Sequence, residues 1–78
     1  MSYMFEVYYK PPMNRAKESS LTSKIALLGG RLDYREDAVE HTGICLTYEF
    51  DDHEKAMEAA KVLRQLGEHV EGPMDYAA

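Results

Sequence analysis

The chain repeats one pattern of apolar residues and glycines, and this repeat constrains its fold more than any other feature of the sequence. At an offset of 39 residues, the matched positions are Phe5, Val7 and Tyr9 with Ile44, Leu46 and Tyr48. At an offset of 38 residues, they are Ile25, Leu28, Gly29 and Leu32 with Leu63, Leu66, Gly67 and Val70. In each half, a period of two residues is followed by a stripe of helical spacing and then by a short apolar run. This succession predicts a strand, a helix and a second strand in each half.

Four segments predict strands and two predict helices. The strands are expected at 3–9, 31–36, 43–50 and 68–71, and the helices at 15–28 and 53–66. Gly29 and Gly67 follow the two apolar stripes, where a residue without a Cβ atom permits the left-handed conformation that ends a helix. Asp51, with Glu54 three residues later, predicts a capping box at the start of the second helix. The apolar stripe of that helix is expected to reach Leu66.

Two strand–helix–strand halves in so short a chain predict a ferredoxin-like split βαββαβ sandwich of the α+β class. Right-handed crossovers place the first and third strands in the centre of a four-stranded antiparallel sheet, in the order 4-1-3-2, with both helices on one face. Leu32 and Tyr34 of the second strand are expected to face the helices. We expect a single domain over residues 1–73 and a C-terminal tail over residues 74–78. A domain of this size buries only about 60% of the surface that its unfolded chain exposes, so a partner that covered more surface would stabilise it.

Because the helices must cover the apolar face, the opposite face of the sheet is expected to be open. Alternation places on it eight candidate binding residues, which are Glu6, Tyr8, Arg31, Asp33, Arg35, Cys45, Thr47 and Glu49. His69 and Glu71 of the last strand are expected beside them. Both signs of charge lie on this face, so it would complement a second copy of itself across a two-fold axis. Glu6 is expected to pair with Arg31 or Arg35, within the chain or across that axis.

Charge is distributed unevenly along the chain. The net charge of −5 combines +3 up to Arg35, from six basic and three acidic residues, with −8 in the remainder, from three basic and eleven acidic residues. Such a dipolar chain favours head-to-tail contact with another copy or an oppositely charged partner, and solvated helix faces are the alternative. Cys45 is the single cysteine, which excludes an intrachain disulfide and favours a reducing compartment. No apolar run approaches the roughly 20 residues of a membrane-spanning helix, so we expect a cytoplasmic chain without membrane contact.

Three stretches of the sequence resemble the RNA-recognition motif in order and rhythm. They are "YYKPPMNR", "KIALLGGRLDY" and "GICLTYEFDDHEKAMEAA". In that family, aromatic side chains on the two central strands stack on bases. The resemblance places Cys45 and Thr47 at the platform positions of the third strand and Glu6 at that of the first, so only Tyr8 can stack on a base. A carboxylate on this face repels phosphate, so nucleic acid is a disfavoured ligand and stays an alternative.

Two further alternatives use the same fold. The chain resembles the amino-acid-binding regulatory domains, in which a glycine-bearing loop follows the first strand, but here Pro11-Pro12 offer no N–H groups to a ligand. A small enzyme could use Cys45 as a nucleophile, or Glu6 and Glu49 as a carboxylate pair. Three histidines lie on separate predicted elements, and they are His41, His53 and His69. No spacing typical of metal ligands occurs, so the sequence predicts no metal site.

No catalytic residue, metal ligand or cofactor is assigned from the sequence. The favoured interpretation is a small, non-catalytic binding or assembly module. It would self-associate, as a homodimer or a larger homo-oligomer, or dock on a protein partner through its open sheet face. The alternatives are an RNA-recognition-motif-like binder of nucleic acid, a domain that senses a small ligand, and a small enzyme.

Overall fold

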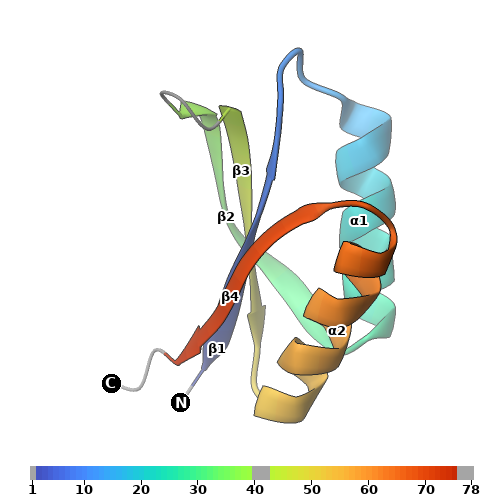
Figure 1. The fold of residues 1–78 in the computed structure, drawn as a ribbon, viewed down its shortest axis with the longest axis vertical. Helices are drawn as coiled ribbons and strands as arrows, with labels where there is room; N and C mark the ends of the chain where they lie inside the picture. Colours follow the sequence, from blue (N-terminus) through green and yellow to red (C-terminus); the bar gives the residue numbers. More distant parts are fainter. Residues whose placement is uncertain (1, 40–42, 76–78) are drawn as a thin grey trace.

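The computed structural model describes residues 2–39 and 43–75 and confirms the expected order of elements. The elements are β1 (Tyr3–Tyr9), α1 (Arg15–Leu27), β2 (Gly30–Val39), β3 (Gly43–Phe50), α2 (His53–Gln65) and β4 (His69–Asp75). The strands form one antiparallel sheet in the order β2-β3-β1-β4, and both helices lie on the same side of it (Figure 1). The chain therefore has the predicted ferredoxin-like α+β fold.

Both helices begin at a polar side chain and end before a glycine. Asn14 caps α1, and its side chain accepts a hydrogen bond from the backbone N–H three residues later, at 2.9 Å. The second helix begins at His53 as predicted, but Asp52 and not Asp51 caps it in the same way, at 3.0 Å. The expected terminators, Gly29 and Gly67, have φ angles of 95° and 89°. These are left-handed conformations that glycine adopts without steric strain.

The core lies between the helices and the apolar face of the sheet. Its principal residues are Phe5, Val7, Leu46, Tyr48 and Phe50 from the sheet, with Leu21, Ile25, Ala56, Ala59, Ala60 and Leu63 from the helices. The Tyr48 hydroxyl is satisfied inside this core because it lies 2.9 Å from the hydroxyl of Thr22. Leu66 was expected in the apolar stripe of α2 but is 54% exposed, since it is the C-cap residue of that helix.

The two edge strands are longer than the sequence predicted. β4 continues to Asp75 through Gly72 and Pro73, beyond the expected end at residue 71. Proline is tolerated there because an edge strand has one side without ladder hydrogen bonds. The predicted tail thus begins inside the sheet, and its last residues, 76–78, lie outside the described part of the chain. β2 likewise continues to Val39, beyond the expected end at residue 36.

Candidate functional site

A β-bulge in β2 determines which side chains reach the open side of the sheet. Leu32 pairs with Tyr48 of β3. The next pair joins Tyr34 to Thr47, which leaves Asp33 as the extra residue. One extra residue shifts the two-residue period by one, so Tyr34, Arg35 and Glu36 each lie on the face opposite to the one that strict alternation gives. The strand also curves along its length, as bulged strands do (Figure 1).

The bulge makes the prediction for Arg35 wrong. Arg35 pairs with Leu46, a core residue, and therefore lies on the helix side of the sheet. There its guanidinium binds Glu18 of α1, with an Nε–Oε1 distance of 2.6 Å. Tyr34 was expected to face the helices, but it is 58% exposed on the opposite side. Glu36, which pairs with a residue of that opposite side, lies there too.

The uncovered side of the sheet is a grid of side chains in three rows. Strand pairing gives the rows His69–Tyr8–Cys45–Glu36, then Glu71–Glu6–Thr47–Tyr34, and then Met4–Glu49–Arg31. We call these eleven residues the open face. Of the eight residues predicted for it, the structure brings together Glu6, Tyr8, Arg31, Cys45, Thr47 and Glu49. Asp33 is the exposed bulge residue, and Arg35 lies on the other side.

The open face carries more negative than positive charge. One guanidinium stands against four carboxylates, a sum of +1 − 4 = −3 with histidine neutral, and the carboxylates are Glu6, Glu36, Glu49 and Glu71. The guanidinium, Arg31, is already held within the chain, at 2.8 Å from Glu49 and 3.1 Å from Asp51. The predicted two-fold pairing of two open faces depended on alternating signs. With Arg35 on the helix side, that alternation is lost.

Glu6 is bonded to neutral groups rather than to an arginine. The Tyr8 hydroxyl donates to Glu6 Oε1 at 3.1 Å, and the Cys45 thiol lies 3.7 Å from Glu6 Oε2. The expected pairing of Glu6 with Arg31 or Arg35 within the chain is wrong, because both arginines bind other carboxylates. Glu6, Tyr8 and Cys45 thus form one hydrogen-bonded group in the centre of the open face.

This central group is not arranged as a nucleophilic site. Cys45 is only 6% exposed, so its thiol is buried although it lies on the open face. Burial raises the pKa of the Cys45 thiol, and the negative charge of Glu6 adds to the increase. Because only the thiolate is a strong nucleophile, the thiol is held in its unreactive form at neutral pH. Burial also raises the pKa of Tyr8, and the neighbouring Cys45 and Glu6 add to that shift.

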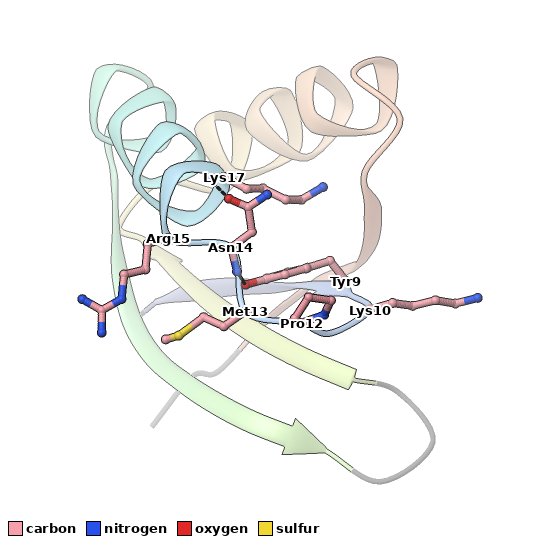
Figure 2. Close-up of a pocket in the computed structure, with 7 residues that line it drawn as sticks. All are labelled: Tyr9, Lys10, Pro12, Met13, Asn14, Arg15 and Lys17. Carbon is pink, nitrogen blue, oxygen red and sulfur yellow. Dashed lines mark hydrogen bonds between the residues drawn. The ribbon is translucent and has the colours of Figure 1, made fainter.

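A second surface feature, which the sequence reasoning missed, lies where the chain crosses from β1 to α1. A hollow of about 500 Å³ is lined there by Tyr9, Lys10, Pro12, Met13, Asn14, Arg15 and Lys17 (Figure 2). We call these seven residues the basic hollow. Lys10 and Lys17 extend to one side of the connection and Arg15 to the other (Figure 2). Lys17 is held 2.9 Å from Glu68 and lies over the ring of Tyr9, whereas Lys10 and Arg15 are exposed. The sequence signal that could have indicated this hollow is the presence of three basic residues within eight positions.

Comparison of the chain with family models, curated proteins and solved structures gives no match. No relative therefore assigns a ligand to either surface. Within residues 2–39 and 43–75, no group of three or more His, Cys, Asp or Glu side chains is placed to hold a metal ion, and His41 lies outside these ranges. No helix in the described part of the chain is long and apolar enough to cross a membrane.

Proposed function

We propose that this chain is a small, non-catalytic assembly module that binds a protein through its open face. The observation that carries the proposal is Tyr34, which lies after the bulge on the uncovered side of the sheet with 58% of its surface exposed. Tyrosine is enriched at protein interfaces because its ring offers a large apolar contact and its hydroxyl a polar one. Tyr8 and Met4 extend the same surface on β1.

The charge of the open face favours protein over nucleic acid. Tyr34 gives the face an exposed aromatic ring in addition to the half-buried ring of Tyr8, and a single-stranded nucleic acid could stack on it. However, the four carboxylates of the face oppose the approach of phosphate groups. The central thiol is protonated and buried, which also favours a binding surface over a catalytic one.

The face is a better docking surface than either sheet edge. The outer strand β2 carries a bulge and a run of charged side chains, and such features protect an edge from pairing with another strand. On the other edge, β4 contains Pro73, which cannot donate to a new ladder. A partner is therefore expected to bind side chains of the open face rather than to extend the sheet.

Site-specific photo-crosslinking tests this proposal. A benzophenone amino acid is placed at Tyr34, where it keeps an aromatic ring, and in a control variant at Met57, which is 50% exposed on α2. We expect crosslinks to protein, either a second copy or another chain, from position 34 and few from position 57. Glu36→Lys should reduce the crosslinks from position 34. Equal yields from both positions, or none from position 34, would contradict the proposal.

A further inference from the structure

We infer that the protein assembles head to tail, with the open face of one copy bound to the basic hollow of the next. Tyr34 of the first copy enters the hollow of the second, and carboxylates of the open face, Glu36 among them, approach Lys10 and Arg15 on either side of it. This inference rests on the proposed function and names the partner of the open face as a second copy of this chain.

Opposite charge on the two surfaces supports this pairing. The open face has a sum of −3, and the basic hollow carries three cations, of which Lys17 is already paired with Glu68. Lys10 and Arg15 are exposed and extend away from the connection in opposite directions, so they can reach carboxylates on either side of a bound group (Figure 2). Complementary charge of this kind orients partners and accelerates their encounter.

The hollow also matches an aromatic side chain in size and chemistry. Its volume of about 500 Å³ leaves room for a phenol ring, and Pro12 and Met13 offer apolar contact, Met13 being 43% exposed. Methionine sulfur and guanidinium groups both interact favourably with aromatic rings. Tyr34 is the most exposed tyrosine in the described part of the chain. Glu36 lies on the same face two residues later, so it would lie at the rim of the hollow when Tyr34 is bound.

A symmetric pairing of like surfaces is disfavoured by the same charges. Two open faces in contact would bring four carboxylates against four, and two hollows would bring cations against cations. The hollow lies at the end of β1 where the chain enters α1, whereas the open face lies on the side of the sheet away from the helices (Figure 1). Because the two surfaces differ, the contact is heterologous, and it produces rings or open chains rather than closed pairs.

Sedimentation velocity on two surface variants and their mixture tests this geometry. The face variant combines Tyr34→Ala with Glu36→Gln, and the hollow variant combines Lys10→Gln with Arg15→Gln. Matched controls on exposed helix positions are Met57→Ala with Glu58→Gln, and Lys24→Gln with Lys61→Gln. We expect the wild type and both controls to form species that grow with concentration, and each surface variant alone to stay monomeric.

The mixture of the two surface variants gives the decisive result. Each variant keeps one intact surface, so an equal mixture should form one-to-one dimers that do not grow further. At about 1 M salt, where the Debye length falls to about 3 Å, association of the wild type should weaken strongly. A hollow variant that associates as well as the wild type would overturn the inference. So would a mixture that stays monomeric.

The inference and the proposed function fail in different ways. A wild-type protein that stays monomeric at high concentration, but whose position 34 crosslinks to a different protein, would overturn head-to-tail assembly and leave the proposed function standing. A monomeric protein without crosslinks from position 34 would contradict both.

Discussion

Glu18 joins the first turn of α1 to the sheet, so its replacement should loosen the helix. Its carboxylate accepts two hydrogen bonds from Arg35 of β2, at 2.6 and 3.0 Å, and a third from the Tyr9 hydroxyl of β1. Both charged side chains are largely shielded from water, with exposed fractions of 14% for Glu18 and 26% for Arg35. Glu18→Ala removes the acceptor for all three bonds, and among the described residues Arg35 then keeps the carboxylate of Asp37, at 3.2 Å.

The expected cost of Glu18→Ala is about 2 kcal/mol in the free energy of unfolding. A hydrogen bond to a charged group contributes roughly 1.5–3 kcal/mol. The expected loss lies below the sum of three such bonds because Arg35 keeps its contact with Asp37 and remains partly hydrated. A chain of this length has a total stability of roughly 4–12 kcal/mol. For a domain of this size the loss corresponds to a decrease of about 8–16 °C in Tm.

The effect of Glu18 should also depend on pH, with a definite sign. The hydrogen bonds from Arg35 lower the pKa of the Glu18 carboxyl below its usual value, although burial acts in the opposite direction. A carboxylate with a lowered pKa in the folded state adds stability that is complete above its unfolded pKa. That stability is lost as the pH falls through the folded pKa. The difference in unfolding free energy between wild type and Glu18→Gln should therefore be largest near neutral pH and shrink below about pH 4.

Urea unfolding, monitored by circular dichroism at pH 7 and pH 3, measures the cost of Glu18→Ala and the pH dependence of the difference between wild type and Glu18→Gln. Glu58→Ala and Glu58→Gln are the matched controls, since Glu58 is an exposed carboxylate on α2. If Glu18→Ala cost no more than Glu58→Ala, the link between α1 and β2 would not stabilise the fold. A difference between wild type and Glu18→Gln that stayed constant from pH 7 to pH 3 would refute the assignment of that link to an ion pair.

Four further outcomes are expected. Leu63→Ala should cost about 2–5 kcal/mol in urea melts because Leu63 is fully buried, and Thr47→Ala on the open face should cost under about 1 kcal/mol; similar losses would mean that the sheet is inverted. Gly30→Ala should cost about 1–3 kcal/mol, because the added Cβ would lie 2.5 Å from the buried ring of Phe50, and a neutral effect would contradict this packing. Cys45 should react slowly with iodoacetamide in the folded protein at neutral pH and much faster in urea, whereas fast reaction of the folded protein would indicate an accessible thiolate. Titration with a mixed single-stranded RNA should give no affinity tighter than about 10⁻⁴–10⁻⁶ M, and submicromolar binding would restore the RNA-recognition interpretation.

The order of elements could be predicted because the signals for it are local. Alternation of apolar and polar residues along 3–9 and 43–50 indicates that one face of each strand is buried. The glycines after the two apolar stripes indicate where the helices end. The ends of the edge strands were harder to predict. Gly72 and Pro73 usually end a strand, but an edge strand tolerates them, and the edge position of β4 is a property of the assembled sheet.

The composition of the open face could be predicted only in part, because one residue of β2 interrupts the period. Strict alternation from Leu32 through Tyr34 would place Glu36 against the helices as an unpaired buried carboxylate, which is costly. That conflict was visible in the sequence and indicates a bulge before Glu36. The sequence does not indicate that Glu18 is the partner of Arg35, because the two residues are 17 positions apart and lie on different elements.

The bulge at Asp33 connects the stability of the fold to the chemistry of its free surface. By turning Arg35 inward, it gives Glu18 a charged partner and ties α1 to the sheet. The same turn removes a cation from the open face and places Tyr34 there instead. A regular β2 would place an arginine on the face and a tyrosine against the helices, which favours two-fold pairing of like faces. The bulged strand favours a partner with complementary charge and a recess for an aromatic ring, and the basic hollow of another copy offers both.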